Sequence, residues 1–145
     1  MTRYSYSLNV SHDRVDVAIF EGLTKAASSI VMLPLADFES YSVAANFQGR
    51  GLSYALTHLM LLYCKDAAVA HPTVSNAHNH LLRSLPQSGF AQVGPPRVTK
   101  GGKETAASFS CGNVGQALHQ CKQKLLASGL IASGLRNAGP YQWTS

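Results

Sequence analysis

The residues best suited to chemistry in this sequence form the glycine-rich run Gln48-Gly49-Arg50-Gly51-Leu52-Ser53. The first N–H groups of a helix have no partner within the helix, and the helix dipole places partial positive charge at the same end. Glycine lets a phosphate approach the backbone closely, and Arg50 can add a charge contact. The run therefore predicts a turn that binds an anion, with a purely structural turn as the alternative.

Strands precede this turn. Residues 4–10 and 15–19 alternate between apolar and polar side chains, which is the period-two pattern of a half-buried strand. Residues 29–35 are apolar and β-branched until Pro34, which cannot donate to a sheet and should mark a bulge or a strand end. Residues 38–43 resume as a strand.

A helix follows the turn, because apolar residues recur at helical spacing from Leu52 to Tyr63. The remaining chain predicts an alternation of short elements. These are a strand at 67–70, a helix at 75–85, a strand at 90–93, a hairpin tip at 101–102, a returning strand at 105–110, a helix at 113–128 and a loose tail.

The segment from Val43 to Leu56 reads VAANFQGRGLSYAL and resembles the pyrophosphate-binding motif of the GNAT superfamily of N-acetyltransferases. That motif is a strand ending in Val, a four-residue connection, and Gln/Arg-x-x-Gly-x-Gly/Ala at the start of an amphipathic helix. Gln48, Gly51 and Ser53 occupy the key positions, although Ser53 replaces the usual Gly or Ala. Residues 88–94 are similar to the Gly-Phe strand of the same family, so the resemblance covers roughly residues 28 to 111.

The resemblance implies an α+β fold with a mixed, mostly antiparallel sheet and one splayed strand pair. It also implies a shortened N-terminal helical region, because fewer than forty residues precede Asp37 and none shows helical periodicity. We expect a compact domain at residues 1–112, followed by a C-terminal helix and flexible tail at 113–145.

The activity implied is transfer of an acetyl group from acetyl-CoA to an amine, largely through positioning of the two reactants. In this family the backbone of the splayed strand holds the pantetheine arm, and the glycine turn holds the pyrophosphate. Carried onto this sequence, the cofactor-binding residues are Val43, Gln48, Gly49, Arg50, Gly51, Leu52, Ser53 and Asn76.

Acid–base residues are less well marked. Several family members carry a Glu on the splayed strand as general base, and Glu39 lies four residues before Val43, on the same strand face by parity. Asp37 shares that parity and is the second choice. The Tyr that usually protonates the leaving thiolate is missing, and Ser84 is the candidate in its place.

A short front to the fold predicts an open acceptor groove, unless the C-terminal helix or a second subunit of a homodimer covers it. Open grooves suit macromolecular acceptors such as a protein Lys, an N-terminus or a nucleobase amine, although a small amine is also compatible. The predicted acceptor contacts are Asp37, Tyr41, Arg97, Lys100 and Lys103.

Twelve Lys and Arg against seven Asp and Glu give a net charge of +5, which favours phosphate-bearing partners. The absence of a signal sequence, of a membrane span and of paired cysteines predicts a cytoplasmic protein, and the histidine spacing predicts no metal site. Two alternatives stay open: a GNAT-like module that binds protein or nucleic acid without catalysis, and a basic nucleic-acid-binding domain.

Overall fold

The computed structural model describes residues 4–78, 80–98, 105–128 and 136–137. Within these residues one sheet has the strand order β6-β7-β5-β4-β3-β2-β1-β8. Its strands are β1 (Tyr4–Val10), β2 (Arg14–Glu21), β3 (Thr24–Met32), β4 (Asp37–Val43), β5 (Thr73–His78), β6 (Phe90–Val98), β7 (Thr105–Cys111) and β8 (Arg136–Asn137). The helices are α1 (Leu52–Asp66), α2 (Leu81–Ser84) and α3 (Val114–Ser128), with 3-10 turns η1 (Ala45–Phe47) and η2 (Pro86–Ser88).

The first four strands form an antiparallel meander, as their alternating pattern predicts. Tyr4, Tyr6 and Leu8 of β1 are buried, while the serines between them are only half-buried. Strands β1 and β2 are joined by a three-residue connection at 11–13, so no helix separates them. The expectations of a mixed, mostly antiparallel sheet and of a shortened helical region at the front are confirmed.

Strands β4 and β5 run parallel and separate along their length. They pair at one position only, Asp37 with Thr73. One oxygen of the Asp37 carboxylate, Oδ1, accepts hydrogen bonds from Thr73 Oγ1 (2.8 Å), Ser75 N (2.9 Å) and Ser75 Oγ (2.8 Å). The strands are therefore held together where they begin and part toward Val43 and His78, which confirms the predicted splayed pair.

A β-bulge at Ser40 changes which face the β4 side chains occupy. Ser40 has a φ of 58°, and the β3–β4 register shifts between Ser28 and Ile30. As a result Val43 shares the buried sheet face of Phe38, whereas Glu39 lies on the opposite face. The expectation that Glu39 and Val43 share a face is wrong, because parity holds only in a strand without an extra residue.

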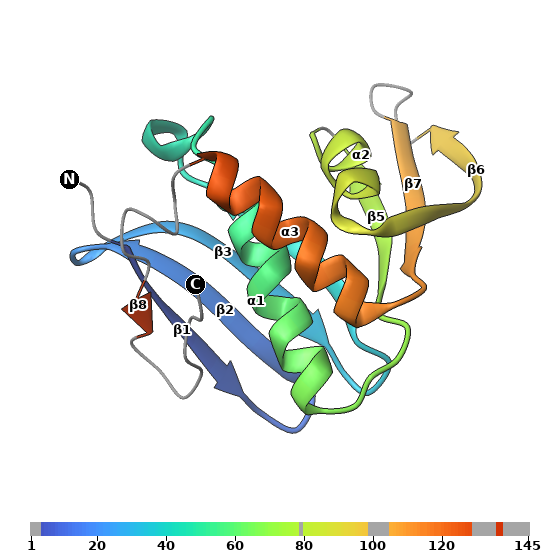
Figure 1. Cartoon of the computed structure of the whole chain (residues 1–145), viewed down its shortest axis with the longest axis horizontal. Coiled ribbons are helices and arrows are strands. Elements are labelled where there is room, and N and C mark those ends of the chain that lie inside the picture. The colour runs from blue at the N-terminus through green and yellow to red at the C-terminus, as the bar shows by residue number, and fades with distance from the viewer. Residues whose placement is uncertain (1–3, 79, 99–104, 129–135, 138–145) are drawn as a thin grey trace.

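Helix α1 packs on one face of the meander, α3 packs against α1 and η2, and α2 lies beside β5 (Figure 1). The buried side of α1 contributes Ala55, Leu56, Leu59 and Met60 to the core, and α3 adds Ala117, Cys121 and Leu125. The predicted C-terminal helix is thus present and packs onto the same core as the sheet. No described helix is both long and apolar enough to cross a membrane.

Two predicted elements between α1 and β6 are wrong. Residues 67–70 are not a strand, because α1 continues to Asp66 and its last turn is closed by Val69 N–H donating to the carbonyl of Cys64 (2.9 Å). Residues 75–78 belong to strand β5 rather than to a helix, and α2 is a single turn. The predicted hairpin tip and most of the predicted tail lie outside the described residues.

Candidate functional site

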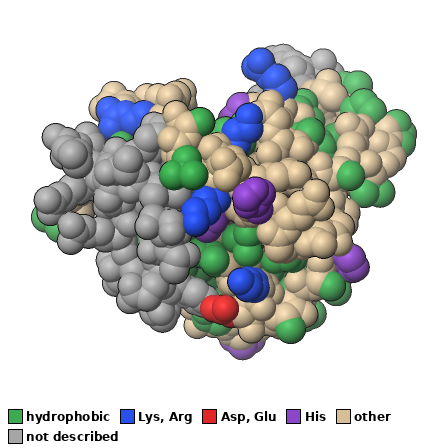
Figure 2. Space-filling model, viewed as in Figure 1, with side chains coloured by type: hydrophobic (Ala, Val, Ile, Leu, Met, Phe, Trp, Pro, Cys, Tyr) green, Lys and Arg blue, Asp and Glu red, His purple; other side chains and the backbone are tan. Residues whose placement is uncertain are grey.

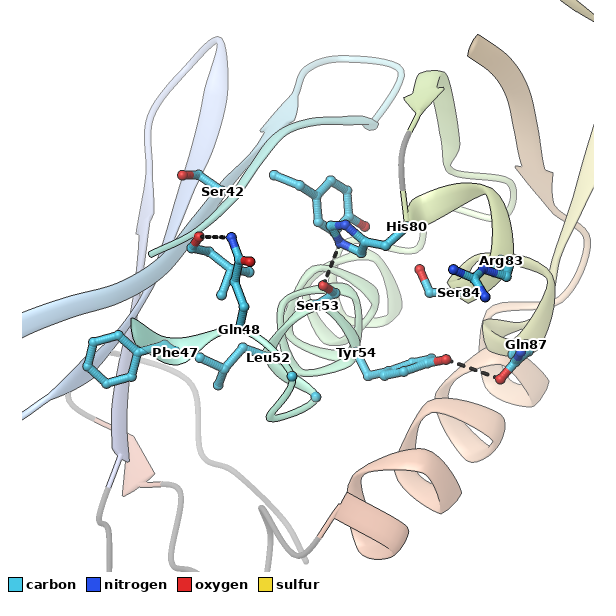
Figure 3. Close-up of a pocket in the computed structure, with 14 residues that line it drawn as sticks. Ser42, Phe47, Gln48, Leu52, Ser53, Tyr54, His80, Arg83, Ser84 and Gln87 are labelled. Atoms are coloured by element: carbon cyan, nitrogen blue, oxygen red, sulfur yellow. Dashed lines mark hydrogen bonds between the residues drawn. The ribbon is translucent and has the colours of Figure 1, made fainter. Parts of the chain in front are cut away.

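A cavity of about 860 Å³ opens where β4 and β5 part, a size typical of small-molecule sites. Its walls come from the end of β4, the glycine turn, the first turn of α1, and the α2–η2 segment (Figure 3). The lining residues are Tyr41, Ser42, Val43, Phe47, Gln48, Gly49, Gly51, Leu52, Ser53, Tyr54, His80, Arg83, Ser84 and Gln87. Most of the predicted cofactor contacts are therefore brought together in one place.

The glycine turn has the geometry expected of an anion site. Gly49 and Gly51 have φ values of 80° and 81°, which side-chain-bearing residues rarely adopt. Gly51 caps α1, and its carbonyl accepts the first intrahelical bond from Ala55 N–H (3.2 Å), so the amides of residues 52–54 precede the helical ladder. Gln48 Nε2 donates to the carbonyl of Val43 (3.3 Å), which ties the turn to β4.

His80 joins the first turn of α1 to the segment after β5. Its Nε2 lies 2.7 Å from Ser53 Oγ, and the labelled side chains face each other across the cavity in Figure 3. Burial lowers the pKa of His80, and the nearby His78 lowers it further. His80 was not predicted as a site residue, because a helix was predicted at 75–85 where the structure has strand β5, which ends at His78.

The α1 end of the cavity is further ordered by hydroxyl contacts. Tyr41 OH and Thr57 Oγ1 are 2.8 Å apart, and Thr57 Oγ1 also donates to the carbonyl of Ser53 (3.0 Å). Burial raises the pKa of Tyr41, so this phenol stays neutral at physiological pH. Tyr41 was predicted as an acceptor contact, and the structure places it in the lining of this cavity, beneath the splay.

Arg50 does not line the cavity, in contrast to its expected contact with an anion. Its Nη1 donates to Tyr4 OH (2.8 Å) and lies 3.4 Å from Glu21 Oε2, while its guanidinium stacks over the Phe47 ring. Another arginine, Arg83, lines the cavity from α2. On the helix-bearing face as a whole, Lys, Arg and His side chains predominate over Asp and Glu (Figure 2).

The carboxylate of Glu39 lies on the far side of β4 from α1, on the same face as Asp37 and Ser42. Burial raises its pKa, and the neighbouring Asp37 carboxylate raises it further through its charge and a hydrogen bond. Glu39 does not line the cavity, but Ser42, on the same face of β4, does. Residues from both faces of β4 therefore border the gap between β4 and β5.

The other predicted residues are divided between the cavity and its surroundings. Ser84 is buried and lines the cavity, near a hydrogen bond from Tyr54 OH to Gln87 Oε1 (3.1 Å). Asn76 lies outside the lining, because its Oδ1 accepts from Arg97 Nη2 (2.9 Å), which also donates to the carbonyl of Ser75 (2.7 Å). Lys100 and Lys103 lie outside the described residues.

A metal-binding arrangement is not found in the described part of the chain, where no three His, Cys, Asp or Glu side chains are grouped suitably. The three cysteines are buried free thiols.

No protein-family model and no curated protein sequence matches this chain. Solved structures do. The ribosomal-protein-S18-alanine N-acetyltransferase from Escherichia coli has a TM-score of 0.60 at 22% identity over 70% of each chain. Nourseothricin acetyltransferase has a TM-score of 0.59 at 18% identity over 69% of this chain and 65% of its own, so this chain spans just under two thirds of that protein.

A third match is spermidine N-acetyltransferase from Vibrio cholerae, solved with CoA and spermine. It has a TM-score of 0.60 at 12% identity over 74% of this chain and 69% of its own. The fold of this chain is that of the GNAT N-acetyltransferases, as the turn motif predicts.

Affinity measurements can show which of the two arginines, Arg50 or Arg83, contacts the anion. We expect Arg83→Gln to weaken binding of coenzyme A by about tenfold, since a charge-assisted contact to phosphate contributes on the order of 1.4 kcal/mol. Arg50→Gln should change that affinity less than about twofold, because the side chain is held by Tyr4 and Glu21. Calorimetric titration of both variants decides between them, and equal losses would place Arg50 at the anion after all.

Proposed function

We propose that this chain is an acetyl-CoA-dependent N-acetyltransferase. One observation carries the proposal: the cavity between the splayed ends of β4 and β5 contains the glycine turn and the N-terminus of α1. An anion-binding helix end therefore lies next to the end of β4, which pairs with β3 but has no strand to pair with on its β5 side. The two features together suit a ligand with a phosphate group and an extended amide-containing arm.

Coenzyme A has that chemistry. Its diphosphate would lie against the amides of residues 52–54 and near Arg83, where the helix dipole favours negative charge. Its pantetheine amides would pair with β4 at Ser42 and Val43, in place of the strand that is missing there. The acetyl thioester would then lie deeper in the splay, toward Tyr41.

The acceptor amine would reach the thioester from the Glu39 side of β4. The Glu39 carboxylate takes one proton from the ammonium form of the acceptor. The neutral nitrogen attacks the carbonyl carbon, a C–N bond forms, and the C–S bond breaks with its electron pair leaving on sulfur. The second proton of the nitrogen passes to the thiolate, which leaves as the thiol; Ser84, buried in the cavity wall, is the candidate group to donate to the sulfur and to be reprotonated by that second proton.

The residues around Glu39 support this role. A raised pKa makes its carboxylate a stronger base than an ordinary surface Glu. Most of the rate enhancement would come from holding amine and thioester in line, with Glu39 and Ser84 handling the protons. A cytoplasmic location belongs to the same proposal, since its co-substrate is a metabolite and its cysteines are free thiols.

A non-catalytic module that binds a protein or nucleic acid is the second candidate. It is favoured by the missing family Tyr at the thiolate and by the position of Glu39 outside the cavity lining. The two functions make different predictions for turnover, whereas both allow coenzyme A to bind.

Coenzyme A binding is tested by a matched pair of substitutions at Gly51. Asn and Asp both tolerate its left-handed backbone and have similar size, but only Asp adds a negative charge at the anion site. We expect Gly51→Asp to weaken binding more than about tenfold, which corresponds to roughly 1.4 kcal/mol, and Gly51→Asn to weaken it much less. Titration calorimetry measures both, and similar affinities for the two variants would contradict the proposed phosphate position.

The role of Glu39 is tested by the pH dependence of turnover. A base acts in its ionised form, so kcat/KM should rise with pH through the pKa of Glu39, which lies above its ordinary value of 4.5. Glu39→Gln should remove this limb and lower kcat by about 100-fold while leaving coenzyme A affinity unchanged. The measurement is thiol release from acetyl-CoA in the presence of an amine. A variant with normal kcat and an intact acid limb would exclude Glu39 as the base.

A further inference from the structure

A second hollow lies on the opposite face of the sheet from α1. It is a trough of about 400 Å³ across β1, β2 and β3, and it reaches the bulge residue Ser40 of β4. None of the described helices packs on this face of the meander, and its described residues are all at least partly exposed. Among the described residues no element covers the trough, and its floor is the sheet itself.

The strand register connects this trough to the candidate catalytic residues. One row of directly paired residues crosses the four strands as Ser7, Ala18, Ser28 and Ser42. The neighbouring row is Asn9, Asp16, Ile30 and Glu39. Paired residues lie on the same face, so both rows line the helix-free side and end on β4. The first row ends at a residue of the 860 Å³ cavity, and the second ends at the candidate base.

The first row is made of small side chains, which is why a trough forms. The short side chains of Ser7, Ala18 and Ser28 leave a depression in the sheet surface between the larger side chains of residues such as Phe20 and Ile30. A narrow channel of this kind fits an extended small molecule better than the flat surface of a macromolecule. The volume lies near the lower end of the range for small-molecule sites.

Charges are separated along the trough. Asp37 and Glu39 do not line the trough, but they lie together on the same face of β4, next to the Ser40 end of the trough. Lys25 stands at the other end, paired with Phe20 and exposed. Arg14 also borders the trough, but its Nε lies 3.3 Å from Asp16 Oδ2, so its charge is partly matched. The trough thus offers an anionic end for an ammonium group and a cationic end for an anion.

We propose that this trough binds the acceptor, and that the acceptor is a small primary amine carrying a carboxylate. The proposal rests on the acetyltransferase function above and deepens it. The ammonium group lies at Glu39, and the carboxylate pairs with Lys25. Lys25 is one strand and five residues from the Glu39 position, because Ile30 pairs with Glu39, which is about 17 Å between Cα positions at ordinary strand spacings. An extended lysine side chain and the shorter glutamate side chain span roughly half of that distance between them, so the two charges of the acceptor are about 6–10 Å apart.

The reaction on such an acceptor is transfer of the acetyl group from acetyl-CoA to its amine. The amine nitrogen gains the acetyl group, coenzyme A leaves as the thiol, and the two protons lost by the ammonium are divided between Glu39 and the sulfur. The carboxylate at Lys25 is unchanged by the reaction. Its function is to hold the chain of the acceptor along the row of small residues, so that the nitrogen meets the thioester in line.

The experiment compares 6-aminohexanoate with hexylamine, two primary amines of equal chain length that differ in the carboxylate. We expect kcat/KM to be at least about tenfold higher for 6-aminohexanoate, the size of a charge-assisted contact. Lys25→Ala should abolish this preference by lowering only the 6-aminohexanoate value, and Lys25→Arg should retain it. Ala18→Trp, which fills the floor, should lower the values for both amines while coenzyme A affinity stays unchanged.

Equal kcat/KM for the two amines, or a preference that survives Lys25→Ala, would overturn the proposal. So would a protein that binds coenzyme A and acetylates a peptide or a nucleic acid but neither small amine. A protein that does not bind coenzyme A at all would instead overturn the acetyltransferase function. Calorimetry on the unaltered chain separates these failures before any acceptor is added.

Discussion

The structure depends on the hydrogen bonds that the Asp37 carboxylate accepts at the start of β4 and β5. One oxygen receives Thr73 Oγ1 and both the amide and the hydroxyl of Ser75. Hydrogen bonds to a charged group contribute about 1.5–3 kcal/mol each, which makes this the point where the two strands are held. Beyond it β4 and β5 form no further pair, so the β4 backbone is unpaired on its β5 side where the glycine turn and α1 begin.

The bulge at Ser40 places the side chains before it and after it on different faces of β4 than an unbroken strand would. Tyr41 and Val43 lie on the α1 side of β4 and line the cavity proposed for the cofactor, whereas Glu39 and Asp37 lie on the opposite face, the face of the trough proposed for the acceptor. An extra residue in one strand is a small change, yet it puts the proposed base and the proposed thioester site on opposite sides of a single strand. Two reactants that enter from opposite faces can meet in line without competing for space.

Much of the fold was predictable, because its signals are local. The alternation of β1 and β2, the glycines of the turn and the helical spacing of α1 and α3 each depend on residues close in sequence. The features that were missed depend on distant partners. The direction of Arg50 is set by Tyr4 and Glu21, far away along the chain, and nothing near position 50 announces it. The bulge at Ser40 could not be predicted from the sequence either, since serine carries no preference for a left-handed backbone.

The central claim is that coenzyme A lies between the splayed strands with its phosphates on the first turn of α1. Backbone amide shifts of the isotope-labelled protein, followed by NMR as coenzyme A is added, test it most directly. The account predicts the largest changes at residues 49–54 and at Ser42 and Val43, with the amides of β1 little affected. Changes centred on another surface, or none at saturating coenzyme A, would contradict it.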